Sequence, residues 1–118
     1  MEGDEPKIVW AVKDPRGKPV VLTEDARDHI IDGHEELVYY VDSLCDSVRH
    51  PRMILQDRHD FDTHLYCCKG KDIGCPEDLW LKTVVRFDIS DSGKVITAYF
   101  PDRIPQGDIL WLPPRIKK

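Results

Sequence analysis

Side chains that could bind a phosphate are predicted to share one face of a hairpin over residues 79–100. Strand alternation puts Arg86 on the same face as Trp80, and the returning strand adds Thr97 and Tyr99. A guanidinium presents a fixed fork of donors that suits a phosphate, and nearby hydroxyls could add hydrogen bonds. The alternative is that these side chains are only solvated, with the Arg86 stem lying over an aromatic ring.

Histidines and cysteines crowd into the stretch before this hairpin, at His59, His64, Cys67, Cys68 and Cys75. These residue types are zinc ligands, so a metal module is one hypothesis. However, the spacings match no structural zinc pattern, and adjacent cysteines on a strand point to opposite faces. The alternative is a strand edge that carries thiols in a reducing compartment, and we expect no metal and no cofactor.

Length and charge limit the classes of function. A chain of 118 residues suits one domain, and its net charge of −5 argues against tight, non-specific nucleic-acid binding. The charge is uneven, because residues 1–48 hold 5 Lys/Arg against 12 Asp/Glu and residues 49–118 hold 12 against 10. A local cationic site is therefore still possible. No long apolar run or apolar signal segment occurs, so we expect a cytoplasmic protein with no membrane contact.

The elements that position the hairpin follow from periodicity and capping. β-branched and aromatic runs predict an antiparallel hairpin of strands 79–89 and 94–100. Thr23 is a good N-cap for a first helix, and Gly33 is a natural stop for it. The other predicted strands are 8–13, 19–22, 53–56, 64–69 and 109–112, and the predicted helices are 24–32 and 35–48.

This order of elements predicts an α+β fold, with two N-terminal helices packed on an antiparallel β-meander. Residues 7–112 form the single predicted domain. Residues 1–6 are expected to be a disordered tail, and residues 113–118 a basic C-terminal tail.

The order of several short motifs resembles that of phage-associated nuclease-like domains of the barnase, EndoU, colicin and RelE fold group. The resemblance covers about Val20 to Pro101 and implies a barnase/RelE-like fold. The motifs are Thr23–Ile30, Gly33-His34-Glu35-Glu36-Leu37, His50-Pro51-Arg52-Met53-Ile54, Lys82–Phe87 and Val95-Ile96-Thr97-Ala98-Tyr99-Phe100.

The resemblance implies an endoribonuclease, toxin-like or phage-associated, that cleaves RNA without a metal by attack of a ribose 2′-hydroxyl on the adjacent phosphate. His29 and His34 match the family's histidines and would carry the proton transfers. Arg86 matches a cation position, Thr97 could bond a phosphate oxygen, and Arg58 is a second candidate cation. The implied partners are an RNA substrate and a protein antitoxin.

A catalytically inactive domain of the same fold is the alternative from a different class. It would act as an inhibitor or regulator that binds a protein partner. The acidic helices of this chain would suit a basic partner.

The resemblance predicts that His29→Ala or Arg86→Ala abolishes RNA cleavage while the protein stays folded, because each change removes an implied catalytic group. Cleavage of a labelled RNA measures the effect. If both variants cleave at the wild-type rate, these two residues are not part of the site.

Overall fold

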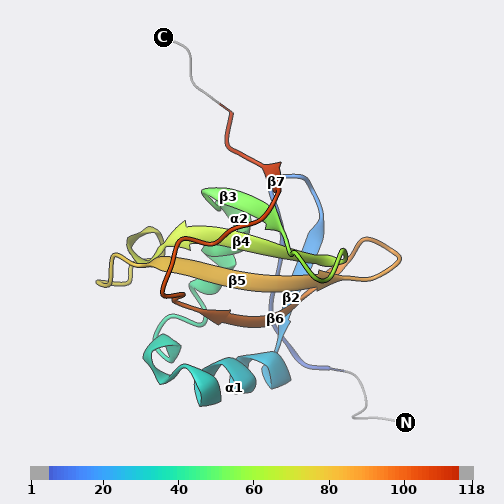
Figure 1. Cartoon of the computed structure of the whole chain (residues 1–118). Coiled ribbons are helices and arrows are strands. Elements are labelled where there is room, and N and C mark those ends of the chain that lie inside the picture. Colours follow the sequence, from blue (N-terminus) through green and yellow to red (C-terminus); the bar gives the residue numbers. More distant parts are fainter. Residues whose placement is uncertain (1–5, 115–118) are drawn as a thin grey trace.

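Seven strands form one mixed sheet with two short α-helices in the computed structural model, which describes residues 6–114 (Figure 1). The strands are β1 Ile8–Lys13, β2 Pro19–Thr23, β3 Met53–Gln56, β4 Thr63–Lys69, β5 Trp80–Phe87, β6 Gly93–Tyr99 and β7 Ile109–Trp111. The helices are α1 Glu24–Gly33 and α2 Leu44–Arg49, and the 3-10 turns are η1 Glu35–Leu37 and η2 Gly70–Ile73. The predicted tails, 1–6 and 113–118, lie mostly outside the described residues.

The strand order is β1-β2-β6-β5-β4-β3-β7. All neighbours are antiparallel except β2 and β6, which run parallel and pair only at Val20–Gly93 and Val21–Lys94. The rest of that edge of β6 lies beside α1 (Figure 1). Because β7 pairs with β3 at the far side, the chain after β6 must pass β5 and β4. Residues 100–108, here called the crossing segment, do so in front of these strands in Figure 1.

The predicted arrangement of two N-terminal helices on an antiparallel β-meander is wrong. The sheet is mixed, and only α1 has more than six residues, since the helix expected over 35–48 is reduced to η1 and the short α2. The N-terminal hairpin takes a place in the sheet that local patterns did not indicate. Val20 and Leu22 of β2 are fully buried and add to the core, while the apolar stripe expected for the second helix is still buried at Leu37, Val41, Leu44 and Val48.

The predicted second helix breaks up for a local reason. Residues 38–41 are Val-Tyr-Tyr-Val, and β-branched and aromatic side chains lose rotamer freedom in a helix. The backbone forms tighter turns instead, in which an N–H donates to the carbonyl three residues earlier, as the Ser43 N–H does to the Tyr40 carbonyl. The Val41 carbonyl also accepts a hydrogen bond from Trp10 Nε1 at 3.3 Å. Neither η1 nor α2 has a side-chain hydrogen bond at its N-cap.

The central hairpin is confirmed as β5 and β6, with a register change near its middle. Val84 pairs with Thr97, but Val85 pairs with Val95, so Ile96 is an extra residue in β6. Such a β-bulge changes which side chains face inward. Val95 is therefore buried in the core, while Ile96 is 42% exposed.

Apolar side chains are buried on both faces of the sheet, but unequally. The main core lies on the face that packs against α2, where the hydroxyls of Ser47 and Thr83 are 2.9 Å apart. The opposite side, here called the open face, buries a smaller cluster of Leu55, Leu65 and Cys67. No helix in residues 6–114 is long and apolar enough to span a membrane.

The crossing segment approaches β3 so closely that residue 107 must be glycine. A Cβ at Gly107 would collide with the carbonyl oxygen of Gln56, whose own N–H donates to the Asp108 carbonyl at 2.8 Å. We expect Gly107→Ala to lower the free energy of unfolding by about 1–3 kcal/mol, as other overpacking changes do. Urea denaturation measures it.

Gly33→Ala at the end of α1 is the matched control, because a Cβ there meets nothing within 4 Å. It should leave stability equal or slightly higher. Equal stability of the Gly107→Ala and Gly33→Ala proteins would show that the crossing segment does not need this close approach.

Candidate functional site

The open face carries the predicted phosphate-binding side chains in a defined register. Tyr99 of β6 lies opposite Lys82 of β5, and Thr97 lies opposite Val84. Alternation and pairing assign the strand residues of this face. They are Met53, Leu55, Thr63, Leu65, Cys67, Lys69, Trp80, Lys82, Val84, Arg86, Thr97 and Tyr99.

His34 reaches this face from the end of α1. Gly33 ends the helix, but the His34 N–H still donates to the Ile30 carbonyl at 2.8 Å. This hydrogen bond fixes the backbone from which the His34 side chain extends. The imidazole stacks on the Tyr99 ring, with centroids 5.4 Å apart and planes 18° apart. The Lys82 ammonium lies 5.1 Å from the centroid of the same ring. His34, Tyr99 and Lys82 are here called the stacked cluster.

The stacked cluster keeps polar atoms within reach of solvent. The His34 side chain is 35% exposed, and its Nδ1 lies 3.8 Å from a carboxylate oxygen of Glu36. A half-exposed imidazole beside an ammonium and a carboxylate has the groups that proton transfer near an anion requires.

Lys82 also lines a pocket of about 480 Å³ between the crossing segment and the loop that follows β3. Three other basic side chains, Arg58, His59 and Arg103, line it together with two acidic residues, Asp57 and Asp102. We call it the cationic pocket because its basic residues outnumber its acidic ones. Among residues 6–114, no carboxylate lies within ion-pair distance of Arg58, Lys82 or Arg103. Such charges are available to an anion.

The loop that carries Arg58 and His59 is held in place by its own hydrogen bonds. The Asp57 carboxylate accepts the backbone N–H groups of His59 and Asp60, both at 2.9 Å. The Gln56 side-chain amide donates to three carbonyls of the loop and its end, at 2.8 to 3.2 Å. Arg58 Nη2 donates to Gln106 Oε1 at 2.9 Å, which joins the loop to the crossing segment.

The five residues predicted for the site do not all meet. His34 belongs to the stacked cluster, Thr97 is half-buried next to it on β6, and Arg58 lines the cationic pocket. His29 is exposed on α1 and makes no hydrogen bond, ion pair or ring contact with the other four within residues 6–114.

Arg86 lies on the open face but is already paired. Its Nη2 is 2.8 Å from the Asp60 carboxylate, and its Nε donates to the same oxygen at 3.1 Å. Hydrogen bonds from the Thr63 hydroxyl and the Asp62 backbone, together with Arg86, hold the pKa of Asp60 below its ordinary value. Arg86 therefore anchors the loop after β3 in this structure.

Sequence reasoning did not select Lys82 or Arg103 for the site, and it considered Tyr99 only as a hydroxyl on the phosphate-binding face. The alternation that placed Arg86 on the open face also placed Lys82 and Tyr99 there, so the face on which they lie could be predicted from the sequence. Arg103 gave no local signal, because its place depends on the pairing of β7 with β3.

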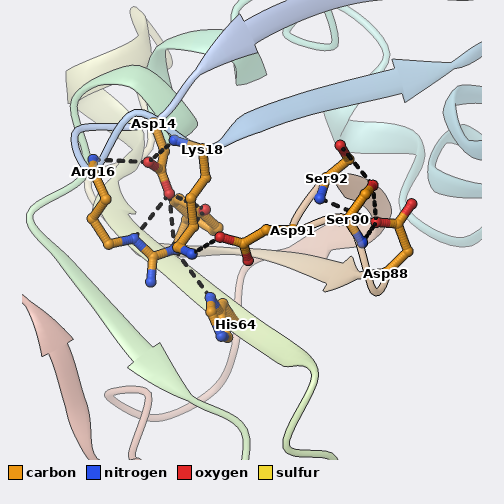
Figure 2. A network of polar contacts seen from close by, with 9 residues as sticks. Asp14, Arg16, Lys18, His64, Asp88, Ser90, Asp91 and Ser92 are labelled. Atoms are coloured by element: carbon orange, nitrogen blue, oxygen red, sulfur yellow. Dashed lines mark hydrogen bonds and ion pairs between the residues drawn. The ribbon is translucent and has the colours of Figure 1, made fainter.

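A second polar network lies on the core side of β4 (Figure 2). The Asp14 carboxylate is buried and accepts from Tyr66 Oη at 2.6 Å and from Arg16 Nη2 at 2.8 Å. The same Arg16 nitrogen lies 3.0 Å from His64 Nδ1. Since a guanidinium can only donate, Nδ1 accepts and the imidazole is neutral. Lys18 and Asp91 form an ion pair that links the β1–β2 turn to the β5–β6 turn.

The environment of this network shifts several pKa values. Burial, followed by the charges of Arg16 and Lys18, lowers the pKa of His64 to about 4. Burial by itself would raise the pKa of Asp14, but hydrogen bonds from Tyr66, the Lys18 backbone and Arg16 hold it below its ordinary value. Burial and the bond to Asp14 raise the pKa of Tyr66. The network therefore clamps the β1–β2 turn to the sheet, and no buried side-chain nitrogen or oxygen atom in the described residues is left without a hydrogen-bond partner.

The cysteines and histidines of the stretch that was considered for zinc do not converge. No group of three His, Cys, Asp or Glu residues in the described range is placed to hold a metal ion. Cys67 belongs to the open-face cluster and Cys68 to the main core, as expected for neighbours on a strand. Burial raises the pKa of both thiols to about 12, so they are unreactive thiols at neutral pH.

The neutral His64 predicts a specific pH dependence of stability. Because its pKa is lower in the folded protein than the ordinary value of about 6.5, the unfolded chain binds the proton first as pH falls. The wild type should lose stability between about pH 6.5 and pH 4. We expect His64→Gln to lose less over the same interval, measured by urea denaturation at several pH values.

His50→Gln removes an exposed histidine at the end of α2 and should keep the wild-type slope. A His64→Gln protein that follows the wild-type slope would exclude a neutral His64.

Comparison of the chain with protein-family models, with curated proteins and with solved structures finds no match to any of them. The case for a function therefore rests on the geometry of this chain.

Proposed function

We propose that the protein is a metal-independent endoribonuclease that cleaves RNA by attack of a ribose 2′-hydroxyl on the adjacent phosphate. The observation that supports it best is the contact of the Tyr99 ring with an imidazole and an ammonium. This cluster lies beside a pocket whose basic side chains have no carboxylate partner in the described residues. This chemistry needs a proton acceptor, a proton donor and cations near the phosphate.

The roles follow from position. His34 transfers a proton, since its half-exposed imidazole is the only one in the stacked cluster and imidazole is the usual side chain for proton transfer. Lys82 joins the stacked cluster to the cationic pocket and stabilises the charge that develops on the phosphate. Arg58 and Arg103 add to this charge from the loop and the crossing segment. The Thr97 hydroxyl can donate to a phosphate oxygen.

The distribution of charge supports RNA binding on the open face in an acidic protein. The carboxylates of the helical edge are Glu24, Asp25, Asp28 and Asp32 in α1, and Glu35 and Glu36 in η1. In contrast, the strands of the open face carry Lys69, Lys82 and Arg86. RNA would be repelled from the helical edge and attracted to the cationic pocket.

The motif resemblance points to the same chemistry. It selects His34 and Thr97, which lie at or beside the stacked cluster, as well as His29 and Arg86, which do not join it. Arg58, the second candidate cation, lines the cationic pocket. Toxin-like or phage-associated action, with a protein antitoxin as partner and a cytoplasmic location, belongs to this proposal.

We expect His34→Gln to slow RNA cleavage by about 10²–10⁴-fold, the usual contribution of a general acid or base. Lys82→Ala should also slow it, because it removes charge next to the phosphate. The assay uses a labelled RNA with a chelator present, and end-group analysis should find a cyclic phosphate.

His50→Gln and Lys13→Ala are the matched controls, since both residues are exposed and lie off the open face; both should cleave normally. If the wild type cleaves no RNA, or if His34→Gln equals His50→Gln, the proposed site is wrong. Loss of activity in His29→Ala alone would move the proton transfer to α1.

A second candidate function is a catalytically inactive domain that binds a basic protein as an inhibitor or regulator. Five of the six carboxylates of α1 and η1 are on exposed residues, and Glu24 is half-buried. Binding of a basic partner that is lost when Asp28 and Asp32 become Asn, in a protein that cleaves no RNA, would favour this candidate.

A further inference from the structure

A larger groove adjoins the cationic pocket on the open face. It has a volume of about 920 Å³ and lies between β3, the loop after β3 and the crossing segment. The groove and the pocket are continuous, because they share six lining residues: Asp57, Arg58, His59, Ile104, Pro105 and Gln106. A ligand of moderate size could therefore occupy both.

The groove has apolar walls that are unusually exposed to water. Phe61 is 84% exposed and Ile104 is 61% exposed, and they come from the loop and the crossing segment that flank it. Met53 and Leu55 contribute from β3. An aromatic side chain this exposed beside aliphatic walls is a typical platform for a flat ring.

Hydrogen bonds hold the walls at a fixed separation. The Gln56 side-chain amide donates to the Phe61 carbonyl at 2.8 Å, and the Gln56 backbone N–H donates to the Asp108 carbonyl, also at 2.8 Å. Gln56 thus ties both flanks of the groove to β3. A preformed groove loses less entropy on binding than a mobile one.

We propose that this groove binds the base of a nucleotide whose phosphate lies in the cationic pocket. A nucleotide combines a flat, largely apolar ring with an anion at a short distance. The described surface offers the same combination, because the groove adjoins Arg58, Lys82 and Arg103. These three have no carboxylate within ion-pair distance in residues 6–114, and they outnumber the pocket's acidic residues, Asp57 and Asp102. The inference deepens the proposed function, on which it rests for RNA as the substrate, and it adds a base subsite to the phosphate site.

Binding to the full chain tests the subsite without any cleavage step. The probes are adenosine 3′-monophosphate, adenosine 5′-monophosphate, adenosine and inorganic phosphate, titrated with a chelator present and followed by calorimetry and amide NMR shifts. At least one nucleotide should bind about tenfold or more tightly than inorganic phosphate, since base stacking adds to phosphate binding.

Variants separate the two halves of the subsite. Phe61→Ala and Ile104→Ser should weaken nucleotide binding roughly tenfold and leave phosphate binding unchanged. Arg58→Ala should weaken both. Tyr39→Ala and Ile89→Ser are the matched controls, because they alter an aromatic and an aliphatic side chain of similar or greater exposure outside the groove.

The outcomes are decisive for the base subsite. Nucleotides that bind no tighter than inorganic phosphate would overturn it, and so would a Phe61→Ala protein that behaves like Tyr39→Ala. Amide shifts confined to the helices would also overturn it. Tight nucleotide binding in a protein that cleaves no RNA would support the subsite and reject only the proposed ribonuclease.

Discussion

The pairing of β7 with β3 is the constraint on which the open face depends. Three strands separate β6 from β7, so residues 100–108 have to cross the sheet, and the Gln56–Asp108 backbone hydrogen bond holds them against β3. The crossing segment lines both the groove and the cationic pocket, on the face where Leu55 and Leu65 are buried. The same backbone contact therefore stabilises the fold and shapes the candidate site.

Each face of β4 carries a different kind of polar chemistry. On the core side, Asp14, Arg16 and Tyr66 satisfy one another, and buried groups that are fully paired specify one geometry. On the open face, Lys82, Arg58 and Arg103 have no carboxylate partner in residues 6–114. A protein with net charge −5 thus still has three basic side chains without a carboxylate partner around one pocket.

Local patterns predicted the elements better than their arrangement. Strand alternation gave β1 and the β5–β6 hairpin, and Thr23 capped α1 as expected, with its hydroxyl accepting from the Ala26 N–H. The parallel pairing of β2 with β6 and the position of β7 depend on distant contacts, which no local pattern contains. In the same way, the sequence placed Arg86 on the correct face, but its pairing with Asp60 depends on a loop that folds over β5.

The place of α1 has a consequence for the behaviour of the protein in solution. Since β2 pairs with only two residues of β6, the remaining outer backbone of β6 is shielded by α1 (Figure 1). An uncovered strand edge is a template for a strand of another molecule. Fraying of α1 would therefore expose the outer edge of β6 to pairing with a strand of another molecule. By covering this edge, α1 reduces the tendency to aggregate, and its end also positions His34.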